Sequence, residues 1–223
     1  MRRVPLPLAP GMAHNERVTA LTQVEAVDVL VASALRRSGA ATADGADDLV
    51  ARARRWGPDL EAGVRAVFEP ADADALVARL AEIVVAGWLD RPQALRDRDR
   101  DRLLTPDWFQ RPDAQGYVAY TDRFAGTLSG IATHLDYLRE LGTTYLHLMP
   151  LLKPRAGAND GGYAVADYRD VRSDLGTMAD LEALATALHE SGIALTIELV
   201  LNPVAREHPW AEAARRGEAH YRV

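Results

Sequence analysis

Hydrophobic residues in the second half of the chain gather in three short runs. The runs cover residues 116–120, 143–151 and 193–203, and they are rich in Val, Ile, Leu, Tyr and Thr between Gly and Pro positions. Such runs are typical of strands buried on both faces. Two segments with helical spacing of apolar residues, 129–141 and 179–191, separate them. The alternation predicts a parallel α/β sheet with right-handed crossovers.

The first half of the chain has helical spacing throughout. Apolar residues three and four positions apart predict a helix over 21–37, and two more over 46–56 and 59–68 because Gly57-Pro58 is expected to end the first of these. A fourth helix is expected to start at Asp72 or Asp74 as its cap. Its apolar stripe comprises Leu76, Val77, Leu80, Ile83, Val84 and Trp88. We expect a helical body without strands, in which Trp56, Phe68 and Trp88 are largely buried.

These patterns predict three parts of the chain. Residues 1–20, with several prolines and no period, are expected to be a mobile terminus. Residues 21–95 form the expected helical domain, and 96–223 the α/β domain. The boundary is placed where hydrophobicity is lowest. There residues 96–102 alternate Arg and Asp, which predicts a solvated linker or the exposed start of a helix.

Composition limits the functions that the chain can have. A chain of 223 residues with 48% hydrophobic residues can bury a sizeable core, and it has no run of eighteen apolar residues. We expect no secretory leader, because the apolar start of the sequence is short and broken by prolines. The absence of cysteine excludes disulfides and cysteine-ligated metals. A net charge of −6, with both signs mixed along the chain, gives no basic face for nucleic acid. We expect a cytoplasmic protein without a cofactor, a metal, or a nucleic-acid or membrane partner.

Candidate chemistry follows the strands, because ligands of parallel α/β folds bind at the carboxyl ends of the strands. The connection over 152–176 is long for this kind of unit and contains Asp160-Gly161-Gly162-Tyr163. A carboxylate, a tight turn and an aromatic ring suit a sugar; a turn with a core tyrosine is the alternative. No glycine-rich nucleotide loop follows any predicted strand.

Longer strings of residues resemble amylosucrases, a family within the α-amylase superfamily of glycoside hydrolases and transglucosidases. The order of the motifs is collinear with that family from about residue 95 to residue 221. The strings are Tyr-Val-Ala-Tyr-Thr-Asp-Arg-Phe-Ala-Gly-Thr-Leu at 117–128, Leu-Arg-Glu-Leu-Gly at 138–142, Thr-Tyr-Leu-His-Leu-Met-Pro-Leu at 144–151, Asp-Gly-Gly-Tyr-Ala-Val at 160–165, Asp-Tyr-Arg-Asp-Val at 167–171 and Leu-Gly-Thr at 175–177.

The resemblance implies a helical N-terminal domain followed by the first three βα units of an incomplete (β/α)8 TIM barrel. It also implies that Asp160 and Tyr163 line the pocket of the transferred glucosyl unit, and that Asn202 is the asparagine that ends the third strand. Two positions depart from the family pattern, since Glu198 replaces an Asp and Pro203 replaces a His. Proline cannot donate the hydrogen bond of that histidine, so the resemblance implies a weakened site.

In the family, the nucleophile and the acid/base come from later strands, so no residue here is assigned a catalytic role. The resemblance implies glucosyl transfer from sucrose to an α-glucan, with this chain a truncated and inactive N-terminal part. One alternative is a non-catalytic module that binds glucan or another protein; another is an unrelated α/β enzyme. Three parallel strands cannot close a barrel. We therefore expect the side chains on one face of the third strand to be uncovered, either Ile197, Leu199 and Leu201 or their neighbours that point to the opposite face. We also expect this open edge to allow self-association.

Overall fold

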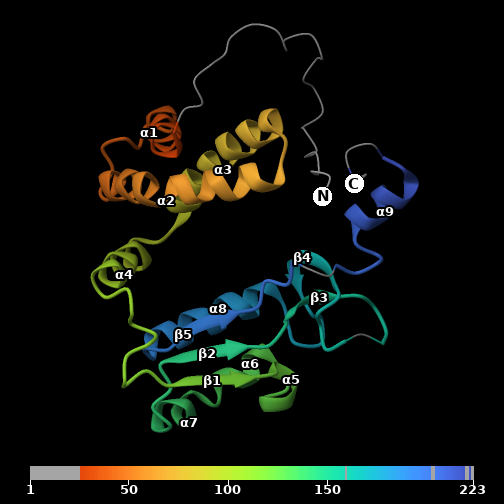
Figure 1. The fold of residues 1–223 in the computed structure, drawn as a ribbon. Helices are drawn as coiled ribbons and strands as arrows, with labels where there is room; N and C mark the ends of the chain where they lie inside the picture. The colour runs from red at the N-terminus through yellow and green to blue at the C-terminus, as the bar shows by residue number, and fades with distance from the viewer. Residues whose placement is uncertain (1–25, 159, 202–203, 219–220, 222–223) are drawn as a thin grey trace, which may run out of the picture. The chain divides into compact units, whose positions relative to one another are not determined.

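The computed structural model describes residues 26–158, 160–201, 204–218 and 221 (Figure 1). The chain divides after Leu104 into two compact units, one of residues 1–104 with 217–223 and one of residues 105–216, and each is described by itself. The sequence-based ranges 21–95 and 96–223 stay a proposal, which this division supports with a boundary a few residues later. The predicted mobile terminus lies outside the described residues.

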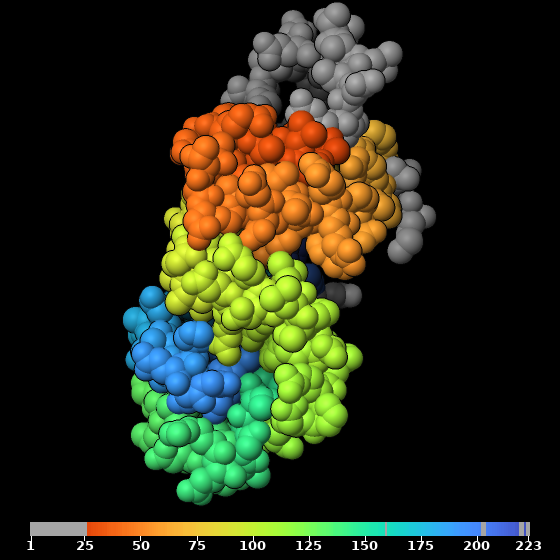
Figure 2. Space-filling model, turned by 90° about the vertical axis from the view of Figure 1, so that its left-hand side faces the viewer, coloured from red at the N-terminus to blue at the C-terminus, as the bar shows by residue number. Residues whose placement is uncertain are grey.

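The first unit is a helical body. Within its described residues it contains no strand, and its helices are α1 (Val27–Arg37), α2 (Ala46–Val67), α3 (Pro70–Asp90) and α4 (Gln93–Leu104). Figure 2 shows the residues of α1, α2 and α3, coloured from red through orange to gold, packed closely against one another. Their shared core contains Val31, Leu35, Val77 and Val85. The alternating Arg and Asp residues lie in α4, which buries none of its side chains. The expectation of an exposed helix start, and not that of a linker, is therefore the right one.

The prediction that Gly57-Pro58 ends a helix is wrong. α2 continues through Pro58, because its packing on α1 outweighs the missing backbone donor. Gly57 faces α1 so closely that a Cβ there would lie 2.7 Å from the Cβ of Val27. Trp56 precedes Gly57 and points about 100° away from it around the helix, so its side chain does not face α1. Trp56 is 54% exposed, and the prediction that it is buried is therefore also wrong. Trp88 is buried as predicted, and Phe68 is half-buried.

The start and the buried face of α3 also differ from the prediction. The helix starts at Pro70 after Glu69, so Asp72 and Asp74 lie inside it and neither is its cap. Proline suits the first helical position because the backbone donor that it lacks has no partner there. The buried side is narrower than predicted and leaves Ile83 and Val84 exposed, since α3 meets α1 and α2 along one face. Its buried members are Ala73, Val77, Ala81, Val85 and Trp88.

The second unit confirms the predicted partial barrel. Its parallel sheet has three strands in the order β1-β2-β5, and within the described residues the sheet does not close. The strands are β1 (Gly116–Ala119), β2 (Tyr145–Leu148) and β5 (Ala194–Ile197), each shorter than its apolar run. The helices are α5 (Thr121–Phe124), α6 (Leu128–Ala132), α7 (Leu135–Glu140) and α8 (Met178–Glu190), so the first predicted helix is in fact two.

One face of this sheet packs on the helices and the other does not. Leu146 and Leu148 of β2 are fully buried in the core with Leu128, Leu184 and Leu188. Beyond β5, Leu199 and Leu201 are mostly exposed, and Ile197 is also exposed at the edge. This confirms the expectation that apolar side chains near the third strand lack cover. Ile197 is paired with Leu148 and lies on the helix-facing side of the sheet. Its neighbours Thr196 and Glu198 point to the opposite face, because side chains alternate along a strand.

The long connection after β2 contains an antiparallel hairpin that the sequence analysis did not predict. It consists of β3 (Leu152–Pro154) and β4 (Val165–Val171). Val165 bridges to Val204, and the Val165 carbonyl accepts a hydrogen bond from the Ala205 N–H at 2.8 Å. The hairpin therefore holds the segment after β5, which leads to α9 (Pro209–Arg216). Among the described helices, none combines the length and apolar character needed to cross a membrane.

Candidate functional site

Three strands end in register at one edge of the sheet. Ala119 of β1 is paired with Leu148 of β2, and Leu148 is paired with Ile197 of β5. Each strand is followed by a residue that can project from this edge, and two of these are Tyr120 and Glu198. The carboxyl ends of parallel strands are where folds of this kind place their ligands.

Glu198 meets a histidine on the face of the sheet that the helices leave uncovered. His147 lies in β2 between the buried Leu146 and Leu148, so its side chain points to the opposite face. Its Nε2 atom lies 3.4 Å from Oε1 of Glu198. Glu198 is one methylene longer than aspartate, and its carboxylate reaches across to the neighbouring strand.

Tyr163 joins this pair from the long connection. Its hydroxyl donates to the same Oε1 atom of Glu198 at 3.5 Å. Burial raises the pKa of the Tyr163 phenol, and the negative charge of Glu198 and the neighbouring Tyr120 raise this pKa further. Tyr163 is therefore a neutral hydrogen-bond donor at physiological pH, placed beside one carboxylate, one imidazole and a second phenol.

Two glycines turn the chain so that Tyr163 reaches the sheet. Gly161 and Gly162 have φ angles of +83° and +98°, which side-chain-bearing residues rarely adopt. A Cβ at Gly162 would lie 2.9 Å from the carbonyl oxygen of Pro150, and one at Gly161 would lie 3.4 Å from the Tyr120 hydroxyl. The turn therefore needs glycine for its conformation and for its close approach to the loop after β2.

Asp160 was expected to share a sugar pocket with Tyr163; that pocket stays a prediction, and in the structure Asp160 makes a hydrogen bond within its own turn. Its exposed carboxylate accepts a hydrogen bond from the Ala164 N–H at 2.9 Å and so closes its own turn. In the described residues no hydrogen bond or ion pair joins Asp160 to Tyr163 or Glu198. The structure thus brings together Tyr163 and Glu198. Asn202 and Pro203 lie outside the described residues.

Comparison with known proteins identifies the family of the second unit. The model of the family described as alpha amylase, catalytic domain, matches residues 103–222, which is more than half of the chain. The chain belongs to this alpha-amylase family. The finer likeness to amylosucrases stays a proposal.

Two curated relatives and one solved structure illustrate the similarity. The oligo-1,6-glucosidase of Parageobacillus thermoglucosidasius is 40% identical over 93 residues, which are 42% of this chain and 16% of the relative. The alpha-glucosidase of Pediococcus pentosaceus is 40% identical over 119 residues, 50% of this chain and 21% of the relative. The solved trehalose-6-phosphate hydrolase of Bacillus licheniformis is 32% identical with a TM-score of 0.46, and the match covers 50% of this chain and 21% of that chain. The chain therefore spans about a fifth of the length of such relatives.

Two residues of the candidate site in this alpha-amylase-family unit were missed by the sequence analysis. His147 lies inside the apolar run 143–151, and Tyr120 is the last residue of the run 116–120. A histidine inside a buried strand, and a phenol at the carboxyl end of a strand, are signals that could have found them.

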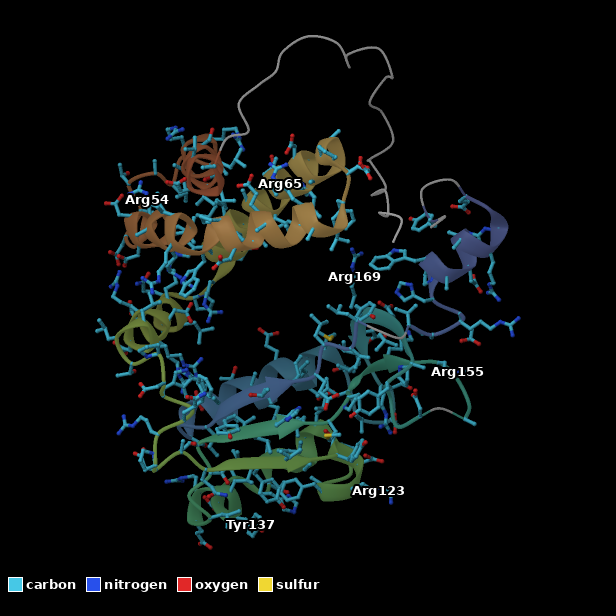
Figure 3. All side chains as sticks on the ribbon, viewed as in Figure 1. Arg54, Arg65, Arg123, Tyr137, Arg155 and Arg169 are labelled. Atoms are coloured by element: carbon cyan, nitrogen blue, oxygen red, sulfur yellow. The ribbon has the colours of Figure 1, made fainter. Side chains whose placement is uncertain are left out.

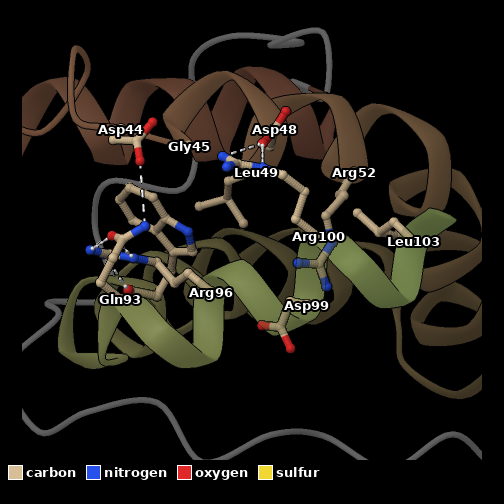
Figure 4. A pocket seen from close by; sticks show the side chains of 11 residues that line it. Asp44, Gly45, Asp48, Leu49, Arg52, Gln93, Arg96, Asp99, Arg100 and Leu103 are labelled. Carbon is tan, nitrogen blue, oxygen red and sulfur yellow. Dashed lines mark hydrogen bonds and ion pairs between the residues drawn. The ribbon is translucent and has the colours of Figure 1, made fainter.

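A small depression in the helical unit does not compete with this site (Figure 4). It encloses about 30 Å³, and hydrogen bonds cross it between side chains of α2 and α4 or the loop before α2. Arg100 pairs with Asp48 at 2.9 Å, and Gln93 donates to Asp44 at 3.4 Å. Arg96 lies over the ring of Trp88, 4.8 Å from its centroid. These contacts hold α4 against the helical body.

Within the described residues, no group of three His, Asp or Glu side chains could hold a metal ion.

Proposed function

We propose that this chain supplies a glucosyl-binding surface of an alpha-amylase-family enzyme that acts on α-linked glucosides. In this proposal the Tyr163 ring packs on the apolar face of the sugar, and Glu198 accepts hydrogen bonds from its hydroxyls. The observation that carries it is the meeting of Tyr163 with Glu198 and His147 at the carboxyl ends of the sheet. Family membership of residues 103–222 supports the same assignment.

The chemistry of the site supports a role in binding. Retaining glycoside hydrolases need two carboxyl groups about 5–5.5 Å apart across the scissile bond. Among the described groups that converge on Tyr163, Glu198 is the one carboxylate, and it is already engaged by His147 and Tyr163. We therefore assign no catalytic residue within this chain, and Glu198 acts in binding the sugar.

The finer proposal is an amylosucrase-type reaction, with sucrose as the glucosyl donor and an α-glucan as the acceptor. The collinear strings at 117–128, 144–151 and 160–177 support it. Asp160 and Asn202 stay in this proposal as further sugar-binding residues, with Asp160 released from Ala164 when sugar binds. The cytoplasm stays the proposed compartment.

A second candidate function is a module that binds glucan or another protein without catalysis. The exposed Leu199 and Leu201 beside an unpaired strand favour it, because such an edge can be covered by another chain. If the other protein is a second copy of this chain, sedimentation can measure the resulting self-association.

Saturation-transfer NMR on the 223-residue chain tests the proposal. Sucrose and maltose should receive saturation from the protein, and the β-linked cellobiose should receive less. Tyr163→Ala should weaken sucrose binding about tenfold, since it removes the ring and a hydroxyl. Tyr137→Ala, at an exposed tyrosine of the same unit, is the matched control and should bind as the parent does.

Two outcomes would contradict this account. Sucrose binding that is equal in the parent and in Tyr163→Ala would place the sugar elsewhere. Release of glucose or fructose from sucrose above the buffer blank would contradict the assignment of no catalytic residue to this chain.

A further inference from the structure

His147 contacts the carboxylate of Glu198 from the central strand of the sheet. β2 is paired with β1 on one side and with β5 on the other, and its residues Leu146 and Leu148 are fully buried. The imidazole between them therefore projects from a firmly held strand. Its Nε2 atom lies 3.4 Å from Oε1 of Glu198, and the two side chains are 29% and 21% exposed, so each shields the other from water.

Two protein groups converge on one oxygen of this carboxylate. Oε1 of Glu198 accepts a hydrogen bond from the Tyr163 hydroxyl at 3.5 Å, and it is also the atom that His147 approaches. Within the described residues, Oε2 takes part in no hydrogen bond or ion pair. An ionised carboxylate accepts through both oxygens, so Oε2 is left for the hydroxyl group of a ligand.

Glu198 depends on such a contact more than an aspartate would. Its side chain has one more rotatable bond, and the rotamer freedom of a side chain is entropy that binding must remove. A carboxylate that its neighbours hold before the ligand arrives avoids part of this cost. Tyr163 belongs to a loop, whereas His147 belongs to the sheet, so the histidine is the fixed partner in this contact.

The titratable groups that face Glu198 come from three elements. They are His147 from β2 and Tyr163 from the long connection, with Tyr120 from the end of β1 beside Tyr163. Histidine is the side chain that ordinarily changes its charge between about pH 5 and about pH 8. His147 is therefore the group in this cluster whose charge varies near neutral pH.

Arginines of the neighbouring loops are paired with other carboxylates. Arg172 pairs with Asp174 at 2.6 Å. Arg155, which projects from the hairpin in Figure 3, pairs with Glu207 at 3.2 Å. Within the described part of the chain, no arginine or lysine forms an ion pair with Glu198, so its cationic partner is the histidine.

We propose that His147 is a positioning residue, which holds Glu198 through Oε1 and leaves Oε2 to accept a hydrogen bond from the sugar. The identity of the ligand rests on the proposed function, whereas the hold on Glu198 rests on the contact itself. A hydrogen bond from a protonated imidazole to a carboxylate is stronger than one from the neutral ring. Sugar binding therefore tightens as the pH falls and His147 gains its proton.

Sucrose titrations of the whole chain at about pH 5.5 and about pH 8, followed by saturation-transfer NMR, test this dependence. The parent should bind about twofold more tightly at the lower pH. His147→Leu should weaken binding about fivefold and remove the pH dependence, because it has no donor. His147→Gln keeps an N–H donor without a titrating ring, so it should retain most of the affinity and lose the pH dependence. His189→Gln, at a histidine of α8, is the control and should bind as the parent does at both pH values.

The titration of Tyr163 tests the hold on Glu198 without any sugar. Near the pH at which phenols ionise, a histidine is neutral, so replacing it changes no charge. His147→Leu should lower the pKa of Tyr163, because Glu198 becomes free to leave and its negative charge is one cause of the raised value. His147→Gln should leave this pKa unchanged. Circular dichroism confirms that each variant is folded.

The two measurements separate this proposal from the proposed function. Sucrose binding that depends on Tyr163 but is equal in the parent and in His147→Leu would overturn the role of His147 and leave the proposed function intact. A pH dependence that survives in His147→Gln would also overturn it. If the parent binds no sucrose, the proposed function fails, and the Tyr163 titration still decides the hold. A lowered pKa in His147→Leu alone would support it, and equal values in all three proteins would overturn it.

Discussion

The hydroxyl of Tyr163 donates to Oε1 of Glu198 across 35 positions of the chain, at 3.5 Å. The contact joins the long connection after β2 to the end of β5. It exists because Gly161 and Gly162 adopt positive φ angles and because Glu198 is long enough to reach both Tyr163 and His147.

Glu198→Gln should lower the pKa of Tyr163. Burial is the main cause of the raised pKa and would remain, so the value should fall toward that of a free phenol without reaching it. Ultraviolet titration of the parent and the variant, each compared with its Tyr163→Phe form, isolates this phenol. Because the folded-state pKa is above the unfolded value of about 10, the stability from neutral Tyr163 is lost as pH rises above that value. An unchanged Tyr163 titration in Glu198→Gln would mean that the two side chains do not interact.

Gly162→Ala should disrupt the turn more than a control at another glycine. Both Gly162 and Gly157 have positive φ, but a Cβ at Gly162 would lie 2.9 Å from the Pro150 oxygen, while nothing lies within 4 Å at Gly157. We expect a cost of about 1 kcal/mol for Gly157→Ala and about 2–4 kcal/mol for Gly162→Ala, because the second adds a steric clash to the backbone strain. Urea unfolding measures both, and equal costs would contradict the described turn.

Two tryptophans of the helical unit should differ in their effect on stability. Trp88 is buried against the core of α1–α3, whereas Trp56 is mostly exposed. Trp88→Ala should destabilise this unit by about 3–5 kcal/mol, and Trp56→Ala by about 1 kcal/mol or less. Thermal unfolding followed by circular dichroism gives both values. A larger loss for Trp56→Ala would contradict the exposure of Trp56 and support the prediction that this side chain is buried.

The capping box of α8 should make stability depend on pH. The hydroxyl and the N–H of Thr177 both donate to the Asp180 carboxylate and lower its pKa. A lowered folded-state pKa means that this stabilisation is present above the unfolded value of about 3.9 and is lost as pH falls through the folded value. Asp180→Asn should therefore destabilise the protein near neutral pH, and the difference from the parent should shrink below about pH 4.

The control for this experiment is Asp136→Asn, at a carboxylate whose ion pair with Arg139 spans 3.5 Å on the surface. Surface pairs of this kind contribute little to stability, so this variant should follow the parent at every pH. A difference for Asp180→Asn that is independent of pH would argue against the capping interaction.

The sequence predicted the parts of the fold that depend on local burial. The apolar runs became β1, β2 and β5 because each contributes side chains, Tyr117, Leu146 and Leu195 among them, to one core shared with the helices of this unit. Asp160-Gly161-Gly162-Tyr163 became a tight turn because its two glycines can adopt positive φ. Packing between distant residues decided the rest. Val27 of α1 packs against Gly57 of α2, and this packing keeps α2 helical through Pro58. The two residues lie far apart in the sequence, so no local pattern predicts their contact.

The hairpin and the hydrogen bond of Asp160 within its own turn were not predicted, for related reasons. β3 pairs with β4 across a ten-residue loop and with register shifts, so no short turn signal marks the pair. Asp160 binds its own turn through Ala164, an arrangement that competes with any ligand for the same oxygen. His147 could be identified as a site residue only from the structure, because the parallel register places it opposite Thr196 and beside Glu198.

The central claim is that the Tyr163–Glu198 site binds a glucosyl unit, and tyrosine-selective NMR tests it most directly. In a chain labelled at the tyrosine rings, the Tyr163 signal is assigned by its loss in Tyr163→Phe, and sucrose is then added. We predict saturable shifts of the Tyr163 and Tyr120 signals, with the Tyr137 signal unchanged. Sucrose binding seen by saturation transfer without movement of the Tyr163 signal would contradict the claim.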